Sequence, residues 1–236
     1  MSSINTVTKN FNPGLTHPNY LMRKKLVEAI ISISPMVKGK VMDLGCGSKP
    51  YRSLFECDEY IGVDFENPGH PHLNEQVDVF YDGKTLPFEN NFFDVIFSSE
   101  VFEHVFNLHE LLVELKRVLR PGGKLIFTCP FAFPEHEQPN DFARYTSFAV
   151  ADLMKTNGFS IHTYIKSGNS IEALGQLKMI YAHLHIVSLF KNIPIIRQGV
   201  RLFTYTTINL WTIFWSKILP KSDDLYMNNI VVATKN

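Results

Sequence analysis

The chain has 236 residues, enough to bury a core of its own, and its length suits one domain that carries an insertion. Its 23 Lys and Arg residues balance its 23 Asp and Glu residues, so no net field attracts a polyanion, and nucleic acid is excluded as an expected partner. Cys46, Cys57 and Cys129 form no CxxC pair, which excludes a disulfide framework and fits a reducing compartment.

Residues 1–17 are polar and aperiodic, which predicts a flexible N-terminal arm. They contain no apolar run behind a basic start, so we expect no secretory signal and a cytoplasmic protein. From residue 18, apolar positions recur at helical spacing as far as Pro35, where the predicted helix ends.

Short apolar runs then alternate with helical stretches, which predicts a doubly wound, mostly parallel α/β sheet with helices on both faces. One predicted helix carries apolar residues from Leu108 to Leu119 and ends at Pro121-Gly122-Gly123, and another spans residues 147–157. The predicted strands cover residues 40–44, 60–64, 76–81, 93–98, 124–130, 159–166 and 226–234.

We therefore divide the chain into a core over residues 18–168, a helical insertion over 169–222 and a last core strand over 223–236. In the insertion, one apolar helix face is predicted and a second helix covers residues 202–216, too short for the roughly 20 apolar residues of a membrane span. The predicted face consists of Leu174, Leu177, Tyr181, Leu184 and Val187.

Two interpretations of the insertion remain open. It is a cap folded over the sheet that closes an acceptor pocket, or residues 171–219 form an interfacial surface that contacts a membrane through tryptophans and basic residues. The second interpretation places the protein at the inner face of the membrane.

A ligand site is predicted where the strand ending at Leu44 meets the turn Gly45-Cys46-Gly47, and Asp64 ends the next strand. An acid in that position accepts hydrogen bonds from ribose hydroxyls. The third glycine of a dinucleotide-binding loop is missing, which argues against an NAD-dependent oxidoreductase. S-adenosylmethionine (SAM) has an adenosine without a pyrophosphate and suits this pattern, with Asp43 expected to fix the loop and face the ammonium group of SAM.

Several motifs in order resemble the class I SAM-dependent methyltransferases, and in particular the methyltransferase type 11 group. The resemblance covers residues 38–165 and implies a Rossmann-like, seven-stranded fold. The motifs are Asp43-Leu44-Gly45-Cys46-Gly47, Gly62-Val63-Asp64, Asp82 with Leu86-Pro87-Phe88, Phe93-Asp94-Val95-Ile96, Glu103-His104-Val105 and Leu119-Arg120-Pro121-Gly122-Gly123.

The resemblance also implies a set of cofactor-binding positions. Gly45 and Gly47 match the loop beside the methionine moiety, Asp64 the acid on the ribose, and Phe65 the residue against adenine. The remaining positions implied are Asp82 and Gly83 near the adenine amino group, Ser99 and Glu100 at the mouth of the site, and Asp43 and Cys46 within the glycine loop. The loop departs from the plainest family pattern at residues 48–51.

A hydroxyl acceptor must lose a proton, which requires a base near the transferred methyl group. Glu103 and His104 follow the fourth strand, and His136 lies in the polar loop after the fifth, so these three are the candidate catalytic residues, with His136 as base. A structural role is the alternative for each of these residues. An acid such as Glu103 stabilises a helix N-terminus whatever its chemistry, and an ion pair of Arg144 with Glu137 or Asp141 would give the loop around His136 a purely structural role.

We predict no metal ligand. His70 and His72 lie in a loop, and the spacing of His183 and His185 makes them face apart on a helix.

The expected function is SAM-dependent methyl transfer to a small-molecule or glycan acceptor, with O-methylation of a sugar or a cell-surface polysaccharide precursor favoured. The loop around His136 resembles that of bacterial relatives that act on sugars. A quinone-like or nitrogen acceptor, and a non-catalytic SAM-binding interaction protein, are the alternatives. The sequence leaves the oligomeric state open.

Overall fold

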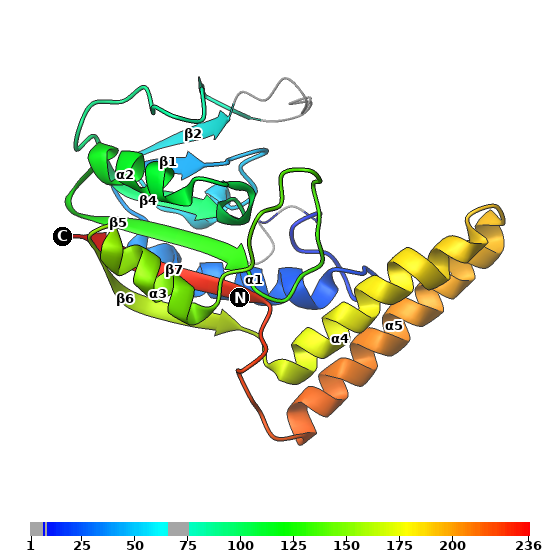
Figure 1. Ribbon diagram of the computed structural model, residues 1–236. Coiled ribbons are helices and arrows are strands. Elements are labelled where there is room, and N and C mark those ends of the chain that lie inside the picture. The colour runs from blue at the N-terminus through cyan, green and yellow to red at the C-terminus, as the bar shows by residue number, and fades with distance from the viewer. Residues whose placement is uncertain (1–6, 8, 66–75) are drawn as a thin grey trace.

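A computed structural model of the protein describes residues 7, 9–65 and 76–236, which form one seven-stranded sheet in the order β3-β2-β1-β4-β5-β7-β6 (Figure 1). All neighbours are parallel except β7, which is antiparallel to both β5 and β6. This confirms the predicted Rossmann-like, doubly wound fold. The strands are β1 (Lys40–Leu44), β2 (Glu59–Phe65), β3 (Val79–Tyr81), β4 (Phe93–Ser99), β5 (Leu119–Pro130), β6 (Phe159–Ser167) and β7 (Asn228–Lys235).

Helices cover both faces of the sheet. The helix α1 (Tyr20–Ile33) packs on one face, and α2 (Leu108–Val118) with α3 (Ser147–Thr156) packs on the other. Successive side chains of a strand point to opposite faces, so Val41 joins the cluster around α1 and Met42 the cluster around α2. Single-turn helices occupy several connections: η2 (Ser34–Met36), η3 (Arg52–Leu54) and η4 (Phe102–His104).

The strand β5 starts earlier than predicted. Its residue Leu119 already pairs with Phe93, and the register with β4 then shifts, so that Val95 pairs with Lys124. The Pro121-Gly122-Gly123 segment, predicted only to end a helix, therefore forms an irregularity within a longer strand, with Gly122 at φ +71°.

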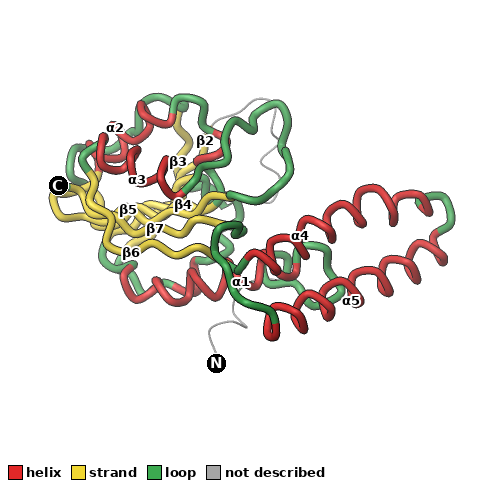
Figure 2. Tube along the Cα trace, turned by 60° about the horizontal axis from the view of Figure 1, so that its bottom comes forward, coloured by secondary structure: helices red, strands yellow, loops and turns green. Residues whose placement is uncertain are grey.

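Two long helices separate β6 from β7. The helix α4 (Ser170–Tyr181) continues through η5 (Ala182–Ile186) and η6 (Val187–Phe190), and α5 (Pro194–Ile218) returns beside it. Both views show this hairpin extending away from the sheet (Figures 1 and 2). The hairpin does not lie over the sheet, so the prediction of a cap folded over the sheet is wrong. The division of the chain into domains stays a prediction.

The buried face of α4 differs from the predicted one. Leu174, Tyr181 and Leu184 are 58%, 62% and 51% exposed, although they were predicted to be packed. The buried positions of α4 include Gln176 and Gly175. Gln176 accepts a hydrogen bond from the Met22 backbone N–H, and Gly175 lies against Thr212 of α5. A pattern of apolar spacing alone does not detect a helix contact made by Gly, Gln and Thr.

The N-terminal segment is held by the hairpin. Asn209 of α5 donates a hydrogen bond to the Leu15 carbonyl oxygen at 2.7 Å, and Gln176 of α4 donates one to the Pro18 carbonyl oxygen at 2.9 Å. Asn209 and Gln176 are fully buried. The arm predicted to be flexible over residues 1–17 thus has a fixed end, while residues 1–6 and 8 lie outside the described residues.

The close approach of the two helices leads to a prediction. A Cβ atom added at Gly175 would lie 2.2 Å from Thr212 Oγ1, so Gly175→Ala is expected to lower the free energy of unfolding by about 1–3 kcal/mol through overpacking. The control is Gly199→Ala on the exposed side of α5, where nothing lies within 4 Å of an added Cβ and the higher helix propensity of alanine adds up to about 1 kcal/mol. Urea unfolding of both variants measures the difference, and an unaffected Gly175→Ala protein would contradict the packing.

Candidate functional site

A cleft of about 840 Å³ opens at the carboxyl ends of β1, β2 and β4. Its floor is the glycine turn after β1. Gly45 has φ +68° and an added Cβ would lie 2.3 Å from Val101, so only glycine fits there. Gly47 has φ +45°, and nothing lies within 4 Å of an added Cβ, which shows that its Cα faces open space in the cleft.

Asp64 connects the end of β2 to this turn. Its Oδ2 accepts a hydrogen bond from the Gly47 N–H at 3.1 Å, and its Oδ1 accepts one from the Phe65 N–H at 2.8 Å. The Phe65 ring is 43% exposed and lies over Gly83, where an added Cβ would be 2.7 Å from the ring. Asp82 accepts hydrogen bonds from the Lys84 and Thr85 N–H groups, which hold its pKa below the ordinary value. Carboxylates and an aromatic face thus border one cleft.

Three of the predicted cofactor-binding residues, Asp43, Cys46 and Ser99, do not border the cleft. Asp43 is 4% exposed and accepts a hydrogen bond from the Tyr60 hydroxyl at 2.6 Å, and burial raises its pKa to about 7. The Cys46 thiol is also buried, and Ser99 Oγ bonds with Thr128 Oγ1 at 2.9 Å. The side chain of Asp43 is therefore held by β2, and its approach to the ligand stays a prediction.

Glu100 borders the cleft at the end of β4, where the backbone turns with φ +58°. Its carboxylate accepts hydrogen bonds from Thr128 Oγ1 at 2.8 Å and from Asn228 Nδ2 at 2.7 Å. Burial raises the pKa of Glu100 above its ordinary value. The residue therefore joins β4 to β5 and β7 at the edge where the cleft opens.

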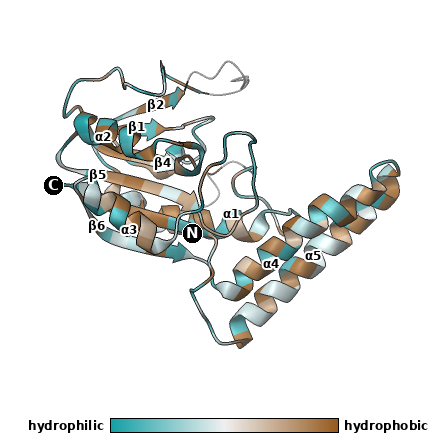
Figure 3. Ribbon diagram, viewed as in Figure 1, coloured by the Kyte–Doolittle hydropathy of each residue, from teal (hydrophilic) through white to brown (hydrophobic). Residues whose placement is uncertain are grey.

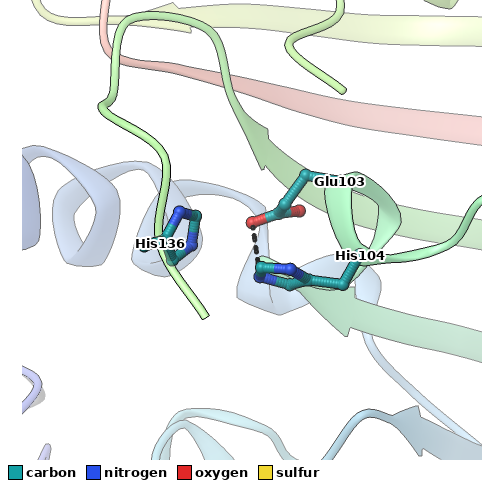
Figure 4. A group of neighbouring side chains, drawn as sticks. All are labelled: Glu103, His104 and His136. Carbon is teal, nitrogen blue, oxygen red and sulfur yellow. Dashed lines mark ion pairs between the residues drawn. The ribbon is translucent and has the colours of Figure 1, made fainter. Parts of the chain in front are cut away.

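The three predicted catalytic residues converge, although they come from two segments of the chain (Figure 4). One oxygen or nitrogen atom from each of Glu103, His104 and His136 lies within 4.8 Å of the others. The imidazole rings of His104 and His136 are 4.8 Å apart, and His104 Nε2 is 3.7 Å from Glu103 Oε1. Both Glu103 and His104 lie on η4, which is anchored because Phe102 stacks on Phe127 of β5.

The Glu103 carboxylate is buried in an unusual way. The residue is 0% exposed, and neither carboxylate oxygen has a hydrogen-bond partner within the described part of the chain. Burial, together with the nearby Glu100, raises the pKa of Glu103 well above its ordinary value. A carboxyl group without a hydrogen-bond partner in the interior costs free energy that the fold must supply elsewhere.

The loop over residues 131–146 brings His136 to η4. Arg144 forms a bidentate ion pair with Asp141, with N···O distances of 2.6 and 2.7 Å, and donates to the carbonyl oxygens of Phe133 and Pro134. Asp141 also accepts the His136 N–H at 2.8 Å. Burial and the neighbouring His104 lower the pKa of His136, so its imidazole is neutral near pH 7. Arg144 therefore forms its ion pair with Asp141, which is one of the two partners considered in the sequence.

A second cavity of about 470 Å³ lies on the other side of His136. It is bordered by the N-terminal segment, the loop and the base of the helical hairpin, so His136 lies on its wall while His104 lies on the wall of the first cleft. Sequence reasoning did not find this cavity, because its walls come from segments far apart in the chain. They include His17, Asn19, Glu135, His183, Arg201 and Tyr205.

The two histidine pairs considered as metal ligands in the sequence lie away from this cluster or outside the described residues. His183 bonds through Nδ1 with the Tyr205 hydroxyl, and His185 is exposed beside Tyr181. They do not form a pair, as expected from their spacing. His70 and His72 lie outside the described residues.

Residues 42–127 match the family model described as a methyltransferase domain. A curated relative from Mycolicibacterium smegmatis, named probable S-adenosylmethionine-dependent methyltransferase, is 26% identical over 161 residues, which are 63% of each protein. The malonyl-[acyl-carrier protein] O-methyltransferase of Calditerrivibrio nitroreducens is 25% identical over 173 residues, which cover 71% of this chain and 64% of the relative. The chain thus spans less than two thirds of the length of these relatives.

A solved structure of similar fold is the phosphoethanolamine N-methyltransferase 2 of Haemonchus contortus in complex with S-adenosyl-L-methionine. The superposition has a TM-score of 0.53 at 17% identity, and it covers 97% of this chain and 58% of that protein. At this identity the similarity shows the fold.

Proposed function

We propose that the chain carries a class I SAM-dependent methyltransferase domain, with SAM as its cofactor, and that it transfers the methyl group of SAM to an oxygen atom of a small-molecule or glycan acceptor. The observation that carries this proposal is the position of Glu103, His104 and His136 between the cleft after β1 and the second cavity. A residue group at such a junction is in reach of both reactants of a transfer reaction.

The residues of the cleft fit SAM. The open space at Gly47 leaves room for the methionine part, and Asp64 is in position to accept hydrogen bonds from ribose hydroxyls. Phe65 offers an exposed ring for the adenine, with Asp82 and the Gly83 backbone beside it. The acidic groups Asp64, Asp82 and Glu100 also suit a ligand that carries a positive sulfonium.

When bound, SAM supplies a methyl group that is electrophilic because its leaving group is a neutral thioether. In the transfer, the acceptor oxygen forms a bond to the methyl carbon, the carbon–sulfur bond breaks and the acceptor loses its proton. We assign the proton to His136, whose lowered pKa keeps the imidazole neutral. His104 and Glu103 border the same position and would orient the acceptor.

The second cavity has room for an acceptor. Its wall combines imidazoles, an amide, a carboxylate and a guanidinium, which suit the hydroxyl groups of a sugar, with apolar side chains that include Phe133, Ile180 and Leu184. A nitrogen acceptor is the competing outcome, since named methyltransferases of this fold act on either atom. Incubation with labelled SAM and a cell extract, followed by identification of the labelled product, decides between them. Tight SAM binding with no labelled product would instead favour a non-catalytic binding protein.

Asp64→Ala is expected to abolish SAM binding in isothermal titration calorimetry, because it removes the carboxylate that both receives the ribose and fixes the Gly47 turn. The matched control is Glu59→Ala at the opposite end of β2, where the exposed glutamate forms an ion pair with Lys40 at 3.0 Å. This control should bind SAM as the wild type does. Wild-type affinity in Asp64→Ala would refute the assignment.

His136→Ala is expected to keep its affinity for SAM and to slow methyl transfer by about a hundredfold or more. Because the pKa of His136 is lowered, the wild-type rate should be constant near neutral pH and fall only on acidification below the ordinary histidine pKa of 6.5, as the imidazole becomes protonated. Single-turnover rates over a pH series test this. An unchanged rate in the variant would exclude His136 from the reaction.

We also propose that the hairpin of α4 and α5 contacts an anionic membrane surface and so brings the enzyme to a membrane-linked acceptor. Hydrophobic residues recur along both helices of the hairpin (Figure 3). Several large apolar side chains there are exposed, among them Leu189 at 77%, Ile195 at 89% and Phe203 at 73%. No helix of the described residues is long and apolar enough to cross a bilayer, so the contact would be interfacial.

The charge of the hairpin supports the same proposal. Residues 173–222 contain no Asp or Glu, although the whole chain has balanced charge. Basic residues beside exposed apolar side chains attract a surface of acidic lipids, at about 1 kcal/mol for each Lys or Arg near that surface. The basic residues are Lys178, Lys191, Arg197, Arg201, Lys217 and Lys221.

Co-sedimentation with phosphatidylglycerol-containing vesicles at low salt is expected for the wild type and not for a triple variant, Leu189→Ser with Ile195→Ser and Phe203→Ser. All three side chains are exposed, so the changes should leave the fold intact. Phe148→Ser is the control, because Phe148 is 84% exposed on α3, outside the hairpin. Wild-type protein that stays wholly in the supernatant would rule out the membrane contact.

A further inference from the structure

The cluster of Glu103, His104 and His136 has the composition of a metal-binding site as well as that of an acid–base site. The three side chains point toward one another from η4 and from the loop after β5 (Figure 4). Two imidazoles and one carboxylate form a donor set that first-row divalent transition metals prefer, whereas Mg²⁺ and Ca²⁺ prefer oxygen ligands.

The Glu103 carboxylate is an independent indication of a ligand. Both its oxygens are buried and without a hydrogen-bond partner among the described residues, and the side chain points at the two histidines. A buried carboxylate is normally paired with a cation or with hydrogen-bond donors. A cation bound between Glu103 and the imidazoles would supply the missing partner.

The hydrogen bond of His104 leaves one ring nitrogen available to bind a cation. Its Nδ1 lies 2.6 Å from the Asn140 carbonyl oxygen, and a carbonyl only accepts, so Nδ1 carries the proton and Nε2 keeps its lone pair. Nε2 is 3.7 Å from Glu103 Oε1 and also 3.7 Å from Glu137 Oε2. A backbone carbonyl that fixes the tautomer of a histidine is the usual support of a metal-binding imidazole.

The surroundings of His136 act on its Nδ1. Asp141 Oδ2 lies 3.3 Å from His136 Nδ1, and the Arg144 guanidinium, which only donates, lies 3.2 Å from the same nitrogen. A cation bound through Nε2 would place the ring proton on Nδ1, where Asp141 would accept it in place of the contact with Arg144. Although Arg144 brings a positive charge close to the cluster, its guanidinium is paired with Asp141 through two short bonds. The other acidic groups at the cluster are Glu103 and Glu137, and a bound cation would favour the ionised form of both carboxyl groups.

We propose that Glu103, His104 and His136 bind one divalent transition-metal cation, with Zn²⁺, Co²⁺ and Mn²⁺ as representatives of the class. Three protein ligands leave coordination positions open between the two cavities. An acceptor hydroxyl bound there would lose its proton to solvent water more easily, because the cation lowers the pKa of a hydroxyl that it binds, and His136 would then be a ligand and not the base. That use of the cation rests on the proposed methyl transfer, whereas cation binding itself does not.

The test uses the full chain after treatment with EDTA and removal of the chelator. Titration with Zn²⁺ in the calorimeter is expected to show one site per chain, and Co²⁺ is expected to give a visible absorption band that Zn²⁺ abolishes. Glu103→Gln and His136→Ala should each weaken Zn²⁺ binding at least about tenfold. The controls are His109→Ala and His162→Ala, which change exposed histidines outside the cluster and should bind Zn²⁺ as the wild type does.

SAM binding to each variant shows that it is folded, and it separates this inference from the proposed function. Asp64→Ala is expected to lose SAM and keep Zn²⁺, and Glu103→Gln to lose Zn²⁺ and keep SAM. If Glu103→Gln does not fold, His136→Ala gives the same result from a loop position whose side chain is 28% exposed. Wild-type Zn²⁺ affinity in the folded cluster variants, or loss of the site in the control variants, would overturn the proposal.

Discussion

The site depends on the ion pair between Arg144 and Asp141. It closes the loop after β5 on itself, since Arg144 also donates to the carbonyls of Phe133 and Pro134 while Asp141 accepts from the His136 backbone. In this conformation His136 lies beside η4, whose Glu103 carbonyl oxygen accepts a hydrogen bond from the Phe142 N–H. The two charge-assisted bonds between the planar groups of Arg144 and Asp141 fix their orientation as well as their distance. The loop therefore holds His136 beside the buried Glu103 carboxyl group, which has no hydrogen-bond partner among the described residues.

The sheet and the cleft at its edge could be predicted because their signals are local. Buried parallel strands produce continuous apolar runs, and the carboxyl ends of neighbouring strands must meet at one edge, so Gly45, Asp64 and Glu100 were expected in one place. The same topology explains why Glu103 and His136 could be considered together: they follow β4 and β5, which are adjacent. Their distance and the missing partners of Glu103 could not be predicted, since they result from how the loop folds.

The hairpin shows where sequence reasoning fails. Apolar spacing placed Leu174 and Tyr181 on the buried face of α4, but the helix packs through Gly175 and Gln176, which carry little or no apolar signal. The bond of Asp43 has a related origin, because the Tyr60 hydroxyl that donates it comes from β2 and is not evident from the glycine motif. In both cases a partner distant in the chain decides which way a side chain points.

The position of β7 has a consequence for biosynthesis. It lies between β5 and β6 and supplies hydrogen bonds to both, yet it follows them by the whole length of the hairpin. While the ribosome is still making residues 170–227, β5 and β6 each expose an unpaired edge, and such edges are prone to associate with other chains. Synthesis that stalls in this stretch would therefore leave an aggregation-prone intermediate, which a chaperone would need to protect until β7 emerges.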